Sequence, residues 1–442
     1  MPVILNVKVE EIDTNEKRSK YLVSVIGCGQ KGILFAVAFA NAGFKVVCSD
    51  ADVSVIKKVA KGKTPFAGQE TEDNLKSLIT AGQLTVTSEL KKAVSKSDII
   101  IIAVPAKVDD KKKIDFSETL NACKQVGAAL HSGALVIYGV AASLGFIEGT
   151  TKDTLENTSG LKAGADFGLA YCPILDSETN AKQFSKFELR VAGVGKPSLE
   201  AATNILNTIT KNVKQVNDVK TAEIAALFTV AKQDANTALA NELAIFCENV
   251  NIDYFEVLKL LGLNEKICPT TVAEENKNEA YFLLETADNI NAKLRLLSLS
   301  RQINEDMVKH AINLTQDSLR SCGKTLRRAR IAVLGIISPS TATVVFVKML
   351  ELKGAKASLY DPTSRRDSQD LAFVKSSLNE AVEGADCIVI LANDEQFSRL
   401  NLKKLKPLTK TPSIIVDLAG VFEPRKVESE GFKYRGLGRG TG

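Results

Sequence analysis

The amino-acid sequence predicts an α/β protein with two Rossmann-like, doubly wound domains joined by a central helical dimerisation domain. Two sets of short, continuously apolar runs, one near each end of the chain, predict buried parallel strands. Such strands are apolar throughout because helices cover both faces of the sheet. A long stretch rich in alanine and leucine separates the two sets and predicts helix. With 442 residues the chain is long enough for two or three domains.

The first domain follows a short N-terminal extension. Its apolar runs alternate with helical patterns, and this alternation of strands and helices is typical of a parallel sheet with crossover helices. We place the extension at residues 1–20 and this domain at residues 21–196. Its expected strands are YLVSVIG (21–27), KVVCSD (45–50), LTVT (84–87), DIIIIAVP (98–105) and ALVIYG (134–139).

The central domain is expected to be helical over residues 197–322, and residues 197–262 carry no strand pattern. Residues 221–251 contain neither glycine nor proline and predict one helix of about 45 Å. Because an apolar stripe of this length needs a partner surface, we expect a homodimer through this central helix. The stripe consists of Ile224, Phe228, Ala231, Ala235, Leu239, Leu243 and Phe246.

The C-terminal domain, residues 323–442, shows the same alternation of short apolar runs and helical patterns as the first domain. Its expected strands resemble those of the first domain, but the glycine set after its first strand is incomplete. It is therefore predicted to be a second Rossmann-like domain. The expected strands are RIAVLGI (330–336), GAKASLYD (354–361), ADCIVILAN (385–393) and SIIVDLAG (413–420).

Composition excludes several classes of protein. The net charge is +5, with Lys and Asp/Glu interspersed, so we expect no nucleic-acid partner. No apolar run reaches the roughly 18 to 20 residues of a membrane span, and the first residues lack a signal-peptide core. We therefore expect a cytoplasmic protein. The eight cysteines are scattered singly and there are two histidines, so we expect reduced thiols and no metal site.

The strongest chemical signal is VIGCGQKG, which places Gly27, Gly29 and Gly32 between a strand and a helical pattern. The three glycines allow a tight turn, close approach of a pyrophosphate, and close packing of helix on strand. The next strand ends in Asp50, at the spacing expected for a carboxylate that binds a ribose. The alternative, a glycine-rich turn without a ligand, lacks this context.

The sequence therefore predicts a dinucleotide site. No arginine follows Asp50 to hold a 2′-phosphate, so NAD is favoured over NADP. The residues AVP, 103–105, end the apolar run at 98–105 and are expected at the same edge of the sheet. The predicted cofactor-binding residues are Gly27, Cys28, Gly29, Gln30, Lys31, Gly32, Asp50, Ala103, Val104 and Pro105.

Several longer segments, in the same order along the chain, resemble the UDP-glucose/GDP-mannose dehydrogenase family, in particular its UDP-N-acetylmannosamine branch. The resemblance implies an NAD domain, a central dimerisation domain, a C-terminal domain for a UDP-sugar, and a place in polysaccharide biosynthesis. It also implies oxidation of the sugar C6 alcohol to a carboxylate, with a cysteine, Cys268, as nucleophile. The segments are VIGCGQKGILFAVAFANAGFKVVCSDAD, IIIIAVPAKVDDKKKIDFS, ALANELAIFCENVNIDYFEVL, RQINEDM, GAKASLYDP and GFKYRGLGRG.

Other positions depart from the family's pattern. Cys268 lacks the glycines before it and the Pro-Lys-Asp after it, and Ile174 replaces a glutamate. Ala226 and Val230 stand where the family has a lysine and an asparagine on one helix face. Basic residues that grip the sugar nucleotide are missing from the C-terminal domain, between Gly335 and Lys348 and within Asp-Leu-Ala-Gly at 417–420.

These departures leave three hypotheses. The first is the family's reaction, carried out by a divergent site around Cys268. The second is an NAD-binding pseudoenzyme with a regulatory or assembly role. The third is a different NAD-dependent oxidoreduction on another substrate.

Overall fold

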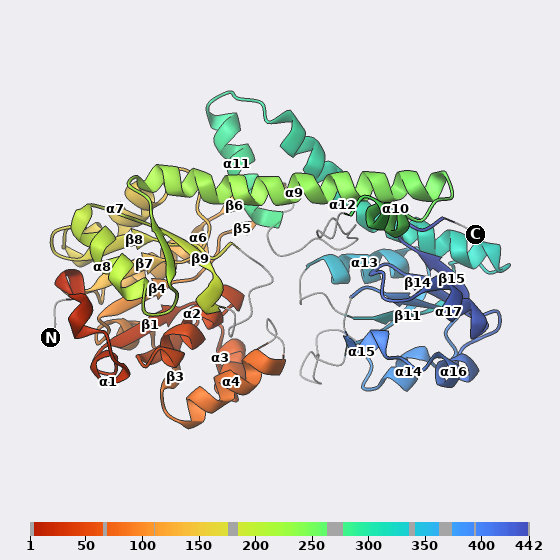
Figure 1. Cartoon of the computed structure of the whole chain (residues 1–442), viewed down its shortest axis with the longest axis horizontal. Helices are drawn as coiled ribbons and strands as arrows, with labels where there is room; N and C mark the ends of the chain where they lie inside the picture. Colours follow the sequence, from red (N-terminus) through yellow and green to blue (C-terminus); the bar gives the residue numbers. More distant parts are fainter. Residues whose placement is uncertain are drawn as a thin grey trace. The chain divides into compact units, whose positions relative to one another are not determined.

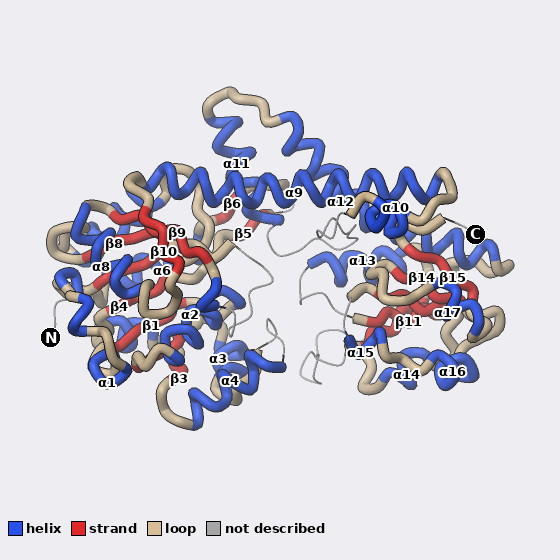
Figure 2. The backbone as a smooth tube through the Cα atoms, viewed as in Figure 1, coloured by secondary structure: helices blue, strands red, loops and turns tan. Residues whose placement is uncertain are grey.

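The structure is a computed structural model of the chain. It describes residues 4–64, 69–109, 111–175, 184–262, 277–335, 341–361, 374–392 and 395–440. The chain divides into two compact units, Met1–Ala231 with Asn278–Lys293, and Lys232–Lys277 with Leu294–Gly442. Each unit contains one large sheet, drawn in red, with helices around it (Figure 2).

The first unit contains an eight-stranded sheet in the order β10-β9-β8-β7-β4-β1-β2-β3 (Figure 1). Neighbouring strands are parallel except β8 and β9. The strands are β1 (Leu22–Ile26), β2 (Lys45–Ser49), β3 (Leu84–Thr87), β4 (Ile99–Ile102), β7 (Leu135–Tyr138), β8 (Gly168–Tyr171), β9 (Glu188–Gly193) and β10 (Asn212–Gln215), with the short hairpin β5 (Lys107–Val108) and β6 (Ile114–Asp115) outside the sheet.

Helices cover this sheet. Lys45 pairs with Leu22 and Ile99 with Val23 in the parallel ladder, so β2 and β4 flank β1. The larger helices of the unit are α2 (Gln30–Asn41), α3 (Val53–Val59), α4 (Gln69–Thr80), α5 (Leu90–Val94), α6 (Ser117–Gly127), α7 (Lys152–Ser159), α8 (Lys196–Leu206) and α11 (Lys277–Asn289); shorter elements are the helix α1 (Asn15–Arg18), the 3-10 turns Ile4–Asn6, Val9–Glu11 and Phe184–Lys186, and the π-turn Ile147–Thr151.

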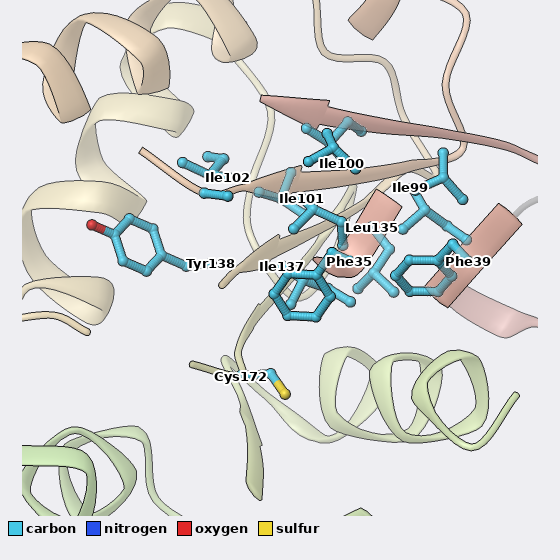
Figure 3. Close-up of a cluster of buried hydrophobic side chains, with 14 of the residues drawn as sticks. Phe35, Phe39, Ile99, Ile100, Ile101, Ile102, Leu135, Ile137, Tyr138 and Cys172 are labelled. Carbon is cyan, nitrogen blue, oxygen red and sulfur yellow. The ribbon is translucent and has the colours of Figure 1, made fainter. Parts of the chain in front are cut away.

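The core of the first unit explains the continuous apolar runs. All four residues of β4 and all four of β7 are buried, as expected for strands with helices on both faces. Figure 3 shows Phe35 and Phe39 of α2 together with the isoleucines of β4. The prediction of a parallel sheet covered by helices is therefore confirmed for this part of the chain.

The expectation that residues 197–262 carry no strand is wrong for residues 212–215. These residues form β10, which pairs in parallel with β9 at the edge of the first sheet. The sequence NVKQ has one apolar residue, and only Val213 is partly buried, so the strand lacks the apolar signal of a central strand. The predicted domain boundaries at 196/197 and 322/323 stay predictions.

The second unit contains a five-stranded, fully parallel sheet in the order β12-β11-β13-β14-β15. Helices on both faces bury it, and its core is formed from two clusters of apolar side chains. The strands are β11 (Arg330–Leu334), β12 (Lys356–Tyr360), β13 (Cys387–Ile390), β14 (Ile414–Asp417) and β15 (Lys433–Gly436). The helices are α10 (Tyr254–Leu260), α12 (Arg295–Ser321), α13 (Thr341–Leu352), α14 (Leu378–Val382), α15 (Glu395–Ser398), α16 (Leu402–Leu405) and α17 (Pro424–Ser429), with a 3-10 turn at Lys406–Leu408.

The predicted long helix is α9 (Val219–Asn249), and the boundary between the two units falls within it. In the second unit, α9 packs against α12 through a buried polar group in which Arg301 donates to the carboxylate of Asp234. Asn304 donates to the same carboxylate at 2.9 Å. Within the described residues, no helix is long and apolar enough to cross a membrane.

The large residues of the apolar stripe predicted on this helix are exposed. Phe228, Leu239, Leu243 and Phe246 are 59%, 51%, 44% and 61% exposed. The face buried within the first unit is a different one, which includes Ala226, Leu227 and Val230. The outward face is therefore apolar without being covered by the residues that the structure describes.

Candidate functional site

The glycine-rich turn links β1 to α2 at the carboxyl edge of the first sheet. Gly27 has φ +95°, in the left-handed region that favours glycine. Its amide donates to the Ser49 carbonyl at 2.8 Å, which ties the turn to the end of β2. Gly29 is the N-cap of α2, so the first amides of that helix point out of the turn.

The space around the glycines fits a bound diphosphate. A Cβ on Gly32 would lie 1.9 Å from the Gly27 carbonyl oxygen, so the third glycine is required by helix-on-strand packing. A Cβ on Gly29 would meet no atom of the described residues within 4 Å, so among these residues the second glycine borders open space. This pattern matches the roles of these positions in a dinucleotide fold, where the second glycine lets phosphate oxygens approach the backbone.

Asp50 lies directly after β2, beside the turn. Its carboxylate accepts hydrogen bonds from the amides of Cys28, at 2.7 Å, and Asp52, at 2.9 Å. These bonds fix the orientation of the carboxylate, and a carboxylate has about four acceptor sites. The half-buried side chain therefore has capacity left for ribose hydroxyls.

The other predicted cofactor-binding residues lie at the same edge. Ala103, whose amide donates to the Ile26 carbonyl at 2.8 Å, begins the segment after β4 and is buried. Val104 is half-buried and Pro105 is exposed. Cys28 is buried, and the hydrogen bond of its thiol with Cys48, followed by burial, raises the pKa of the thiol far above the ordinary value, so it serves as an apolar packing group. Gln30 and Lys31 open α2.

The topology places the two halves of a dinucleotide site. The strand order reverses between β1 and β4, and ligands of such sheets bind across this switch point. Asp50 lies in the half over β2, where dinucleotide-binding folds of this kind recognise the adenosine ribose. The other half lies over the ends of β4, β7 and β8.

A largely buried ion pair joins the first turn of α2 to α11. The Lys31 ammonium is 2.5 Å from Oε1 of Glu279 on α11, and the two side chains are 15% and 10% exposed. Oε2 of Glu279 is buried and has no hydrogen-bond partner among the described residues. The Lys31 side chain is therefore held by α11, although its residue belongs to the glycine-rich turn.

Two buried tyrosines and a second glutamate lie near this pair. Tyr138 and Tyr171 end β7 and β8, with ring centroids 6.3 Å apart. Burial, and then the negative charges of Glu223 and Glu279, raise the pKa of Tyr171 well above its ordinary value. Glu223 of α9 accepts hydrogen bonds from the amides of Gly145, at 2.6 Å, and Ile147, at 2.9 Å. Burial raises the pKa of Glu223 to about 7.

Glu279 and Glu223 are not among the site residues predicted from the sequence. Each is the one charged residue on an otherwise apolar helix face. Glu279 shares its face with Phe282 and Leu283, three and four residues on, and Glu223 shares its own with Ala226 and Leu227. A single carboxylate within an apolar helix face indicates a buried charge with a functional or structural role. This pattern could have been used to predict both glutamates from the sequence.

The positions where this chain departs from the predicted catalytic pattern are apolar in the structure as well. Ala226, Val230 and Ile174 are all buried, with exposures of 3%, 2% and 4%. Cys268, the predicted nucleophile, lies outside the described residues. Asp417, in the second unit, is fully buried and accepts from the Phe422 amide at 2.8 Å and the Tyr434 hydroxyl at 3.2 Å.

Comparisons with known proteins cover nearly the whole chain. Residues 21–214 match the NAD binding domain of the UDP-glucose/GDP-mannose dehydrogenase family, residues 220–306 its central domain, and residues 340–424 its UDP binding domain. A UDP-N-acetyl-D-mannosamine dehydrogenase of Pyrococcus horikoshii is 28% identical over 433 residues, covering 95% of this chain and 99% of that protein. A UDP-glucose 6-dehydrogenase of Rhizobium meliloti is 26% identical over 443 residues, covering 94% of this chain and 99% of that protein.

A solved structure is also similar. The UDP-D-ManNAc dehydrogenase of Pyrococcus horikoshii superposes with a TM-score of 0.79 at 27% identity, covering 95% of this chain and 99% of that one. Together with the domain matches, this likeness confirms the predicted fold class and NAD as the predicted cofactor. The individual residues assigned to the cofactor stay predictions.

Proposed function

Because the chain belongs to the UDP-glucose/GDP-mannose dehydrogenase family, we propose that it oxidises the C6 alcohol of a UDP-linked sugar with NAD. The observation that carries this proposal is the β1–α2 turn, which is open at Gly29 and has Asp50 beside it. NAD supplies the hydride acceptor, and the chain supplies the groups that hold the cofactor and move protons.

The proposed contacts follow from the turn. The amides of Gly29, Gln30 and Lys31 line the approach to the helix N-terminus, where they bind the diphosphate, while the Cys28 amide holds the Asp50 carboxylate in place. Asp50 binds the adenosine ribose. The segment from Ala103 to Pro105 borders the site from the end of β4, with Gly27 and Gly32 shaping the turn itself.

The substrate is proposed to be a UDP-N-acetylhexosamine. The match to a UDP binding domain indicates a nucleotide sugar. Several of the similar proteins are UDP-N-acetyl-D-mannosamine dehydrogenases, which favours that branch over a UDP-glucose enzyme. A panel of UDP- and GDP-sugars with NAD, followed by NADH absorbance, should give turnover with the UDP-N-acetylhexosamines. Binding of NAD without turnover on any sugar would contradict the proposal.

Cys268 is proposed as the nucleophile that holds the aldehyde intermediate as a thiohemiacetal. We expect C268A to lower formation of the carboxylate by at least about 100-fold, because the second oxidation proceeds from the covalent adduct. Mass spectrometry of the sugar product and of the denatured protein measures this effect. The half-buried residue Cys322 offers a matched control, C322A, which should keep the wild-type rate. Wild-type carboxylate formation by C268A would exclude the covalent route.

A second candidate function is an NAD-binding protein without catalysis. The buried apolar residues Ala226, Val230 and Ile174 favour it, because none of them can donate or accept a proton. The sugar panel separates the two functions, since this candidate predicts cofactor binding alone. A different oxidoreduction would instead give NADH with a substrate outside the panel.

We also propose a homodimer through α9. Phe228, Leu239, Leu243 and Phe246 fall on one side of the helix and are 44% to 61% exposed, an apolar face that a second copy would cover. Sedimentation equilibrium should give twice the chain mass of 47.6 kDa. The double variant L243D/F246D should sediment as a monomer, whereas a dimeric variant would place the interface elsewhere.

The proposed compartment is the cytoplasm. All the cysteines within the described residues are free, and most are buried. Free thiols in this number are typical of reducing compartments.

A further inference from the structure

The C-terminal tail, residues 437–440, is bound by main-chain hydrogen bonds to the link between α9 and α10. The Tyr254 amide donates to the Gly438 carbonyl at 2.8 Å, and the Gly440 amide donates to the Ile252 carbonyl at 3.3 Å. Both segments belong to the second unit. After β15 the chain is therefore docked along this link.

Two carboxylates hold the same tail through its polar groups. Oε1 of Glu248 on α9 accepts from the Gly438 amide at 2.7 Å, and its Oε2 lies 3.0 Å from Nε2 of His310. Nη1 of Arg439 lies 2.7 Å from Oδ2 of Asp253, and these two side chains are 13% and 22% exposed. Because the pair is largely buried, salt screens it less than it screens a surface pair.

The contacts of Arg439 also fix the start of α10. Asp253 is the N-cap of this helix, and its Oδ1 accepts from the Phe255 amide at 2.8 Å while its Oδ2 pairs with the arginine. The guanidinium carbon of Arg439 lies 4.8 Å from the centre of the Phe255 ring. This distance is within the range of a cation–π contact. One arginine of the tail thus holds both the cap of α10 and an aromatic ring in its first turn.

The tail approaches α9 and α10 closely because two of its positions lack a side chain. Gly438 has φ +70°, and a Cβ there would lie 3.2 Å from the Cβ atoms of Ala244 and Tyr254. A Cβ on Gly440 would lie 2.4 Å from the backbone carbonyl carbon of Asn251. The glycine-rich sequence at the end of the chain is therefore required by close packing of backbone on backbone.

Phe255 connects the tail to the β14 loop, residues 418–420. A Cβ on Gly420 would lie 3.3 Å from Cζ of Phe255, so the ring packs directly against this glycine. The loop follows Asp417, the last residue of β14, at the carboxyl edge of the second sheet. Parallel sheets of this kind bind their ligands at that edge. The loop also lies within residues 340–424, which match the family's UDP binding domain.

We propose that the C-terminal tail is a clamp that keeps the β14 loop in the shape that binds the UDP of the substrate. This inference rests on the proposed function. Arg439 is a positioning residue in this proposal: its charge is paired with Asp253, and it acts on the β14 loop through the Phe255 ring. The clamp gives a role to the basic, glycine-rich end of the sequence.

Hydrogen exchange of the full chain without ligand tests the clamp itself. In R439M the amides of residues 252–260 should exchange at least about tenfold faster than in the wild type, because the cap and the ring lose their cation. R439K keeps the charge and should exchange at the wild-type rate. R320M is the matched control, since it removes an exposed arginine paired with Asp317 in the same unit, and it should leave the exchange of residues 252–260 unchanged.

A second variant tests the clamp without a change in charge. In G440A the added methyl group would meet the backbone of Asn251, so the tail should detach and residues 252–260 should again exchange faster. If R439M does not fold, G440A and a chain that ends at Leu437 provide the same test. The shortened chain keeps the buried Leu437 and loses every other residue of the tail.

Titration calorimetry with UDP tests the consequence for binding. We expect the dissociation constant for UDP to rise roughly tenfold in R439M and in G440A, because the β14 loop loses its support. The dissociation constant for NAD should not change in either variant, because the β1–α2 turn belongs to the first unit. General destabilisation of the protein would instead weaken the binding of both ligands. R439K and R320M should bind UDP as the wild type does.

Each part of the proposal has its own contradicting result. Wild-type exchange of residues 252–260 in both R439M and G440A would overturn the clamp. Faster exchange with an unchanged dissociation constant for UDP would overturn its role in binding. Loss of UDP affinity in R439M with wild-type exchange would assign Arg439 to direct contact with the nucleotide and overturn the positioning role. Absence of UDP binding by the wild type would contradict the proposed function, whereas the exchange measurement would still decide whether the tail clamps α10.

Discussion

Replacing Gly32 with alanine is expected to destabilise the protein by roughly 3 kcal/mol or more. The added Cβ would lie 1.9 Å from the Gly27 carbonyl oxygen and 3.4 Å from the Ala103 Cβ. The carbonyl oxygen belongs to a backbone that is tied to β2 through the Gly27 amide, so it has little room to move. Urea unfolding followed by circular dichroism should show a lower midpoint for G32A than for the wild type.

The matched control for this variant lies three residues earlier. G29A adds the same methyl group where no atom of the described residues lies within 4 Å, and Gly29 has φ −68° and ψ −175°, which alanine adopts readily. Its unfolding midpoint should stay close to the wild-type value. A wild-type midpoint for G32A would show that the helix and the turn do not approach as closely as described.

The second large effect is expected in G29A itself, as a loss of NAD affinity. The methyl group would fill the open space through which a diphosphate reaches the amides of α2. We expect the dissociation constant to rise by roughly 100-fold, about 2.7 kcal/mol. Calorimetric titration with NAD measures it, and the unchanged fold makes the comparison direct. Full affinity in G29A would place the diphosphate away from this turn.

The central strands could be predicted because burial on both faces leaves a local, continuous apolar run. The strands β4 and β7 are completely buried, and their sequences IIII and LVIY carry that signal. The edge strand β10 was missed because one face and one edge of it are exposed, so its sequence is mostly polar. In β9, buried and exposed residues partly alternate, and the strand runs antiparallel to its neighbour β8. It therefore lacks the continuous apolar run that predicts the parallel strands of the sheet.

The candidate site likewise has one part that could be predicted from the sequence and one part that could not. The glycine-rich turn and Asp50 are separated by one helix and one strand, and their spacing is fixed by the fold, so the motif is readable from sequence. Lys31 and Glu279 are 248 residues apart, and no local spacing relates them. Their contact depends on where α11 packs, which is a tertiary property. The same holds for Glu223, whose partners Gly145 and Ile147 lie just before and at the start of the π-turn that precedes α7.

The most direct test of the account is a crystal structure with NAD bound. The account predicts the diphosphate on the amides of Gly29 to Lys31, a ribose hydroxyl within hydrogen-bond distance of Asp50, and the nicotinamide over the ends of β4, β7 and β8. A dinucleotide bound away from the β1–α2 turn, or with its adenosine ribose out of reach of Asp50, would contradict it.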